Sequence, residues 1–163
     1  MNIFTVPYGS KGFYVKPDTS LNKDSNDYFC PDSINELAAA VFIYARATKA
    51  GKSVSSKFAQ RYYTHVGKGV HFHIPQYIDA ASPQSWWLAH SLDNTTFLTE
   101  EPQELSLTPD EYKALIDQAF EAASKHISFR TGDYIAVEIA PAEKINAGTE
   151  KYTCNNKTIN LIW

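Results

Sequence analysis

Cysteine is scarce in this 163-residue chain, and long apolar runs are missing. The two cysteines, Cys30 and Cys154, form no Cys-x-x-Cys motif and are too few for a disulfide framework. We expect two reduced, buried thiols, as is typical of a cytoplasmic protein, with a single disulfide between them as the alternative. No apolar run reaches the roughly 20 residues that a membrane-spanning helix needs. The sequence therefore predicts a cytoplasmic protein that does not act at a membrane.

Positive charge is not in excess either. Lysine and arginine total 15 against 18 acidic residues, which gives a net charge of −3, and no basic stripe is visible. These features argue against a nucleic-acid-binding protein. Residues 1–10 lack the basic and apolar regions of a signal peptide.

Aromatic residues, in contrast, are abundant, with 10 Tyr, 9 Phe and 3 Trp. Aromatic side chains favour strands, so the composition predicts a β-rich fold. The length suits one domain with its own core, and the chain has neither repeats nor a linker. We therefore expect a single domain over residues 1–163.

Several segments have the pattern of strands. Phe13–Val15 runs into a turn, and Gly69–Ile74 alternates apolar and polar residues. Leu37–Ala47 is ambiguous, because its alanines permit a helix while its Val-Phe-Ile-Tyr centre favours a strand. Further strands are expected within 129–137 and 157–163.

Three segments have helical features. Phe58, Tyr62 and Val66 fall on one face of a helix predicted over Ser55–Val66. Ser82-Pro83 resembles the start of a short helix that carries Trp86 and Trp87, at least one of which we expect in the core. The third helix is Pro109–Ile127, with Thr108 as its N-cap and Glu111 completing a capping box. Its predicted buried face contains Leu115, Ala119 and Ala123, with Tyr112, Ile116, Phe120 and Ile127 beside them.

Three stretches resemble the fumarylacetoacetate hydrolase family, above all its short bacterial members. Phe13–Leu21 is similar to an apolar strand entering Lys-Pro-x-(Ser/Thr). Gly51–Gln76 resembles the segment that leads through a short helix to the family's aspartate ligand. Ser124–Ile135 is similar to a Ser-x-x-x-x-Leu-x-x-Gly-Asp-x-Ile pattern.

The resemblance implies an α+β fold, a β-rich mixed-sheet domain like the family's C-terminal domain with two or three short to medium helices. It also implies that Leu37–Ala47 is a strand and that the protein is a homodimer. The family hydrolyses carbon–carbon bonds in diketo acids, or decarboxylates or isomerises related oxo acids, using Mg²⁺ or Mn²⁺. The family's N-terminal Gly-Arg-Asn-Tyr region and part of its central strands have no counterpart in this sequence.

The family's site positions map onto residues that cannot do the same chemistry. Its two glutamate ligands fall on Ala40 and Phe42, its aspartate ligand falls on His71, and its active-site lysine falls on His90. The family's Gly-Thr-Pro loop corresponds to 138–141, where Gly and Thr are lost. Mg²⁺ and Mn²⁺ need oxygen ligands, which these side chains do not supply. The resemblance therefore predicts no intact catalytic site and no bound cofactor.

Three hypotheses remain open. The first is a family homologue that has lost the metal-dependent activity and acts as a binding or assembly protein, for a small molecule or a protein partner. The second is a divergent hydrolase or lyase with a rebuilt site, in which His71 and His73 lie on one strand face and bind Zn²⁺ or Ni²⁺, with His65 or His90 as a third ligand. The third is an enzyme that uses Lys16, Glu138, Asp93 and His90.

Lys16, His73 and Glu138 are the candidate ligand-binding residues. Each also has an ordinary structural explanation. Lys16 begins a Lys-Pro-Asp-Thr turn, Glu138 follows a strand and is expected as a solvated charge, and Asp93 is expected in a turn.

Overall fold

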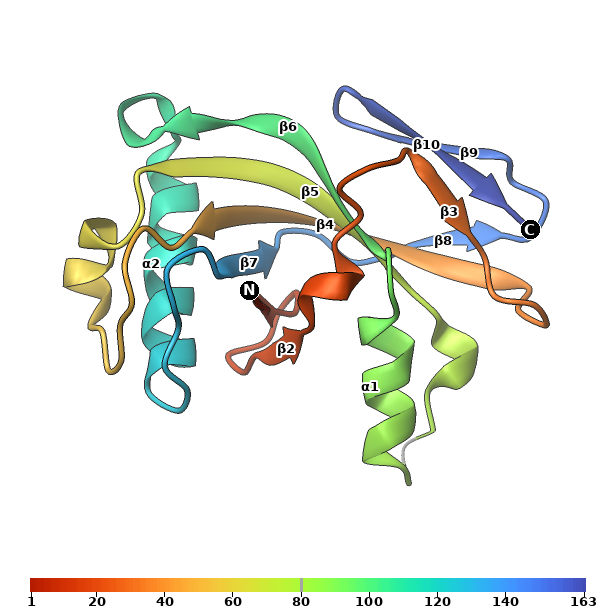
Figure 1. The fold of residues 1–163 in the computed structure, drawn as a ribbon, viewed down its shortest axis with the longest axis horizontal. Coiled ribbons are helices and arrows are strands. Elements are labelled where there is room, and N and C mark those ends of the chain that lie inside the picture. Colours follow the sequence, from red (N-terminus) through yellow and green to blue (C-terminus); the bar gives the residue numbers. More distant parts are fainter. Residues whose placement is uncertain (80) are drawn as a thin grey trace.

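Strands dominate the structure, as the aromatic content predicts. The computed structural model describes residues 1–79 and 81–163 (Figure 1). The strands are β1 (Ile3–Val6), β2 (Tyr14–Lys16), β3 (Asp27–Phe29), β4 (Glu36–Arg46), β5 (His65–His73), β6 (Thr96–Glu104), β7 (Tyr134–Glu138), β8 (Glu143–Asn146), β9 (Lys151–Cys154) and β10 (Lys157–Ile162). The α-helices are α1 (Pro83–Ser91) and α2 (Asp110–Ser124), and the 3-10 helices are η1 (Asp18–Ser20), η2 (Ser56–Arg61), η3 (Pro75–Tyr77) and η4 (Leu105–Leu107).

These strands form two sheets. The larger has the order β2-β1-β7-β4-β5-β6, and β8 also pairs with β4. Within it, β1 and β7 are parallel and the other neighbours are antiparallel. The smaller sheet has the order β3-β10-β9 and lies across one end of β4 and β5 (Figure 1). The fold is therefore the mixed-sheet α+β class that the sequence predicts.

The ambiguous segment Leu37–Ala47 is a strand, so the expectation drawn from the family resemblance is confirmed. It forms most of β4, which hydrogen-bonds to β5 on one side and to β7 and β8 on the other. Leu37, Ile43 and Ala45 are fully buried. Because both faces of β4 are covered, its sequence is a continuous apolar run without the alternation that would mark a half-exposed strand.

One face of the large sheet packs against α2 (Figure 1). The buried stripe of the helix is Ile116, Ala119, Phe120 and Ala123, which are spaced at i, i+3, i+4 and i+7. Leu115, predicted to be buried, is 38% exposed. The prediction centred the apolar face one position too early, because Leu115 and Ile116 are both apolar and adjacent.

The predicted capping box of this helix is wrong. The helix begins at Asp110 with Pro109 at the N-cap position, where no side chain caps it. Thr108 instead donates its hydroxyl hydrogen to the carbonyl oxygen of Glu104, 3.0 Å away. The hydroxyl is thus used to close the preceding η4 turn.

The helix predicted over Ser55–Val66 is also wrong. Only Ser56–Arg61 is helical, as the 3-10 helix η2, and β5 begins at His65. Val66 is therefore a strand residue, and Phe58 is 42% exposed. The i, i+4, i+8 spacing of apolar residues here spans two different elements.

A second core lies between the small sheet and the far end of β4 and β5. Tyr28, Ile159 and Leu161 of the small sheet pack with Leu37 and Phe72. Cys30 and Cys154 are in the same core, and both thiols are buried and free, as expected. Burial raises the pKa of Cys30 to about 11, so the thiol stays protonated and unreactive at neutral pH.

Within the described part of the chain, no helix is long and apolar enough to cross a membrane.

The contact between β4 and β5 generates a stability prediction. Gly69 lies opposite Phe42, and a Cβ atom at Gly69 would overlap the Phe42 ring and lie 2.6 Å from the carbonyl oxygen of Phe97. We expect Gly69→Ala to lower the free energy of unfolding by about 1–3 kcal/mol, measured by urea denaturation. Gly12→Ala is the control, because its new Cβ would meet nothing nearer than Ser10 Oγ at 3.6 Å. Equal stability of the two variants would contradict this account.

Candidate functional site

The positions that the resemblance assigns to metal ligands are neighbours in space. Ala40 on β4 pairs directly with His71 on β5, and Phe42 lies two residues further along β4. The Phe42 ring stacks on the His71 imidazole, with centroids 3.9 Å apart and planes 16° from parallel. All three residues are buried. The Phe42 ring thus covers one face of the His71 imidazole.

Lys16 completes this contact from β2. Its side chain is fully buried, and its Nζ lies 3.3 Å from Nδ1 of His71. Tyr14 and Lys16 are two residues apart on a strand, so both point to the same face. Burial lowers the pKa of Lys16 to about 7, while the nearby Glu138 opposes that shift. The amine therefore loses its proton far more readily than an exposed lysine does.

The Lys16 contact sets the state of His71. The imidazole Nδ1 also lies 3.0 Å from the hydroxyl of Thr96. In its protonated form the Lys16 amine can only donate, so in that form Nδ1 accepts from it and the ring hydrogen belongs on Nε2. Burial and then the Lys16 charge lower the pKa of His71 well below its usual value. His71 is therefore a neutral imidazole, and its buried Nε2 has no hydrogen-bond partner among the described residues.

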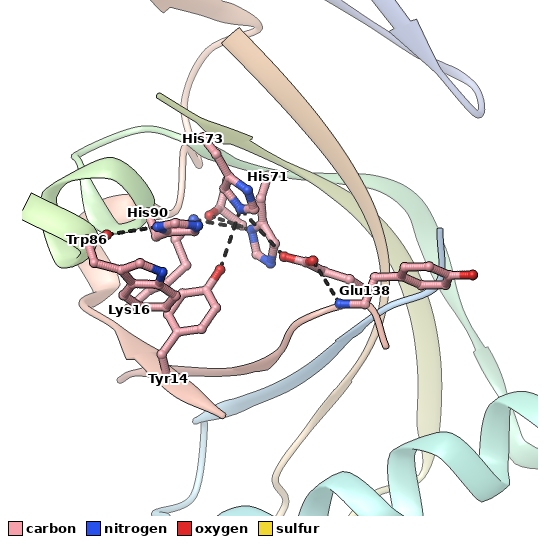
Figure 2. A network of polar contacts seen from close by, with 9 residues as sticks. Tyr14, Lys16, His71, His73, Trp86, His90 and Glu138 are labelled. Carbon is pink, nitrogen blue, oxygen red and sulfur yellow. Dashed lines mark hydrogen bonds and ion pairs between the residues drawn. The ribbon is translucent and has the colours of Figure 1, made fainter. Parts of the chain in front are cut away.

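His73 continues the same face of β5, as the i, i+2 spacing predicts. Its ring centroid is 6.0 Å from that of His71, and its Nε2 lies 3.5 Å from both the Tyr14 hydroxyl and Glu138 Oε1 (Figure 2). Burial lowers the pKa of His73 well below normal, and Lys16 and His90 add to the effect. Neutral His73 and Glu138 therefore do not make a full ion pair.

Glu138 is buried at the end of β7, which contradicts the expectation of a solvated charge. It is 8% exposed, and its Oε2 accepts a hydrogen bond from the backbone N–H of Tyr8 at 3.1 Å. Burial raises its pKa, although that hydrogen bond and the Lys16 charge work in the opposite direction. Residues 134, 136 and 138 share one face of β7, and this face meets the histidines.

His90 approaches from α1, the short helix predicted at Ser82-Pro83. The Ser82 hydroxyl caps this helix by accepting from the N–H of Ser85. The His90 ring lies 4.5 Å from that of His73 and stacks on Trp86 at 4.1 Å, and its Nδ1 donates to the Trp86 carbonyl oxygen (Figure 2). The helix thus brings His90 into the cluster.

Both tryptophans of α1 are partly exposed, with exposed fractions of 37% for Trp86 and 45% for Trp87. The prediction that at least one lies in the core is therefore wrong. Trp86 instead covers the cluster, because its ring meets Tyr14 edge-on at 5.0 Å.

The remaining candidates lie apart from this cluster. His65 is exposed at the start of β5, with its Nδ1 2.9 Å from the Thr64 hydroxyl. Asp93 is exposed in the turn between α1 and β6, as expected, next to Asn94 with φ of 59°. Neither contributes to the buried site.

Comparison with solved structures identifies the fold. A protein assigned to the fumarylacetoacetate hydrolase family from Yersinia pestis CO92 matches with a TM-score of 0.75 and 14% identity, over 99% of this chain and 91% of that chain. The chain has the fumarylacetoacetate hydrolase fold. Maleylpyruvate hydrolase from Sphingobium sp. SYK-6 matches with a TM-score of 0.72 and 11% identity, over 99% of this chain and 70% of that chain. For 5-carboxymethyl-2-hydroxymuconate delta-isomerase from Mycobacterium smegmatis, the TM-score is 0.70 and the identity 12%, over 99% and 78% of the two chains.

Sequence comparison gives no further assignment: no family model matches this sequence, and no curated protein matches it.

The residues at the site do not fit the Mg²⁺ or Mn²⁺ of the fumarylacetoacetate hydrolase family. Ala40 and Phe42 offer no oxygen, and a hard divalent cation prefers carboxylates and carbonyls. The Lys16 amine already contacts His71, and its positive charge would repel a metal ion placed there. Among the described residues, no group of three or more His, Cys, Asp or Glu side chains is arranged to hold a metal.

Sequence reasoning missed the burial of Lys16 and Glu138. The signal was present in the strand alternation, because Tyr14 with Lys16, and Ala136 with Glu138, each share a face. Two neighbouring features obscured this signal: Lys16 begins a Lys-Pro-Asp-Thr turn, and Glu138 is the last residue of β7.

The buried amine generates a prediction about pH. The pKa of Lys16 is lower in the folded state than in the unfolded chain, so between about pH 7 and 10.5 the unfolded chain binds the extra proton. The wild-type protein therefore gains stability as pH rises through this window. We expect Lys16→Met to be more stable than the wild type at pH 7 by about 1 kcal/mol or more, and the difference to shrink toward pH 10.

Urea denaturation at both pH values measures this difference. Lys151→Met is the matched control, because Lys151 is exposed and its replacement relieves no burial. A Lys16→Met variant that is less stable at pH 7, with a deficit that does not vary with pH, would contradict the account.

Proposed function

We propose that this protein is a homologue of the fumarylacetoacetate hydrolase superfamily that lacks the metal-dependent hydrolase or decarboxylase chemistry and acts as a binding or assembly protein. The observation that carries the proposal is the stacking of Phe42 on His71, with the Lys16 amine on the imidazole Nδ1. Two of the positions that the family pattern gives to acidic ligands are apolar here, and the third is an imidazole held by a cation.

The side chains around Lys16 support this proposal. Phe42 and Tyr44 pack on the face of β4 that would otherwise hold ligands, with Leu21 and Ala136 against them. An apolar, close-packed surrounding of this kind raises the free energy of a hydrated divalent ion. Among the described residues, Glu138 is the carboxylate that contacts the cluster, through His73. Burial raises the pKa of Glu138, which disfavours the charged form that a metal ion would need.

A rebuilt histidine site is the second candidate, and one observation favours it. His71, His73 and His90 lie in a row, with centroid separations of 6.0 and 4.5 Å, and Glu138 is beside His73. Imidazole suits Zn²⁺ and Ni²⁺, and the low pKa of each ring leaves it neutral, as a ligand must be. A hydrolase or lyase acting on small oxo acids would follow from such a site.

The proposal includes a homodimer in the cytoplasm. Strands β2 and β6 form the two edges of the large sheet. An exposed sheet edge tends to pair with a strand of another chain or to be covered by another element. Two free, buried thiols suit a reducing compartment.

Thermal unfolding with added metals tests the proposal. A ligand at 100 times its Kd stabilises by about 2.7 kcal/mol, which raises the Tm of a domain of this size by several degrees. We expect no such rise when Mg²⁺, Mn²⁺, Zn²⁺ or Ni²⁺ is added, either to the protein alone or to the protein with oxaloacetate, each compared with the same sample without metal. A rise with Mg²⁺ or Mn²⁺ would overturn the proposal.

Two histidine variants separate the candidates. A rise with only Zn²⁺ or Ni²⁺ that disappears in His73→Ala would establish the histidine site instead. His126→Ala is the matched control, because His126 is exposed beyond the end of α2 and stacks on Phe13 rather than on the clustered histidines. A site built on His73 should keep its metal response in this variant.

A further inference from the structure

A surface basin of about 440 Å³ lies beside the first residues of β7, away from the buried histidines. Its lining includes Leu21, Leu98 and Tyr134, together with Lys23, Arg46 and Lys157. These residues come from β4, β6, β7 and β10 and from the chain after η1. The volume is in the range of small-molecule sites, so the basin can hold a ligand of a few carbon atoms.

Positive charge is concentrated in this basin. The lining contains three cationic side chains and no carboxylate among the described residues, although the chain as a whole has a net charge of −3. None of the three cations belongs to an ion pair within the described structure. The nearby Lys68 is instead neutralised by Glu100 at 3.2 Å. The basin therefore attracts an anion.

Arg46 contributes one of these charges from β4. Its guanidinium lies over the Tyr134 ring, 5.9 Å from the centroid. Arg46 also lines two further pockets of about 680 and 850 Å³, both of which include Glu101. A guanidinium stacked on a ring keeps its edge hydrogens free and can bind a carboxylate through two parallel hydrogen bonds. Lys157 contacts the carbonyl oxygen of Leu98 at 3.4 Å, which leaves two of its three hydrogens available.

The floor of the basin distinguishes between kinds of anion. Leu21, Leu98 and the Tyr134 ring offer an apolar surface beneath the cations. Such a floor favours a carbon chain between charged groups over a compact inorganic ion. The lysines are on different elements from Arg46, so the basin has cations from more than one part of the fold.

We infer that this basin binds a small dicarboxylate, with one carboxylate on Arg46 and the other between Lys23 and Lys157. The inference rests on the proposed function, since it names a ligand class for a binding protein. The cations of the basin lie away from the buried histidines: Arg46 and Phe42 are four residues apart on β4, roughly 13 Å along the strand, although Leu21 of the basin packs against Phe42. The two tests use different ligands and different variants, so metal-induced stabilisation and dicarboxylate binding can fail independently.

Titration of the ¹⁵N-labelled protein with succinate, followed by NMR, tests the inference. We expect saturable shift changes confined to the backbone amides around the basin, and weaker binding at higher salt concentration. Arg46→Gln should reduce the affinity by at least roughly tenfold, because a charge-assisted contact is lost. Arg61→Gln is the matched control, because Arg61 is an exposed arginine that stacks on Phe58, away from the basin.

Three further measurements keep the inference falsifiable. Lys157→Gln provides a second variant from a different strand and should also weaken binding, and the unfolding midpoint of each variant shows whether it folds. Succinamide, the uncharged analogue, should not bind. Shift changes scattered over surface lysines, wild-type affinity in Arg46→Gln, or equal affinity for inorganic phosphate would each overturn the inference.

Discussion

The burial of the Lys16 amine against His71 is the constraint on which the rest of the site depends. A charge removed from water must be compensated or neutralised. Both occur here, because the pKa of Lys16 falls to about 7 and the Glu138 carboxylate lies close enough to oppose that shift. His71 must then stay neutral so that its Nδ1 can accept from the amine. One buried cation thus fixes the protonation state of its neighbours.

Charge balance accounts for the neutral side chains at Ala40, Phe42 and His71. The pattern that the sequence resembles places acidic side chains around a divalent cation. The buried Lys16 amine, which lies at Nδ1 of His71, carries at most one positive charge, so a set of carboxylates around it would be left uncompensated. Neutral side chains at these positions, with Glu138 as one remaining carboxylate, give a more closely balanced cluster. The stacked Phe42 ring also covers one face of the His71 imidazole.

The sequence predicted the scaffold better than the site. Strand and helix positions followed from local signals such as the Ser82 cap and the apolar stripe of α2, and the family resemblance resolved β4, which periodicity alone could not. Strand alternation puts Lys16 on the face of Tyr14 and Glu138 on the face of Ala136, but their burial also requires β2, β5 and β7 to meet in space, which no local pattern reports. Thr108 shows the same limit, because its hydroxyl had two acceptable partners and only the tertiary structure decided between them.

The fold and the chemistry of this chain are separable for a physical reason. The pairing of β4 with β5 is made by backbone hydrogen bonds, which do not depend on whether Phe42 or an acidic residue projects from the strand. The same fold is therefore found at 11–14% identity, where most side chains differ. That face has two parts here, a neutralised cluster around Lys16 and an uncompensated cationic basin around Arg46. The second part is where the proposed anionic ligand would bind, because three cations that form no ion pair in the described structure line one basin there.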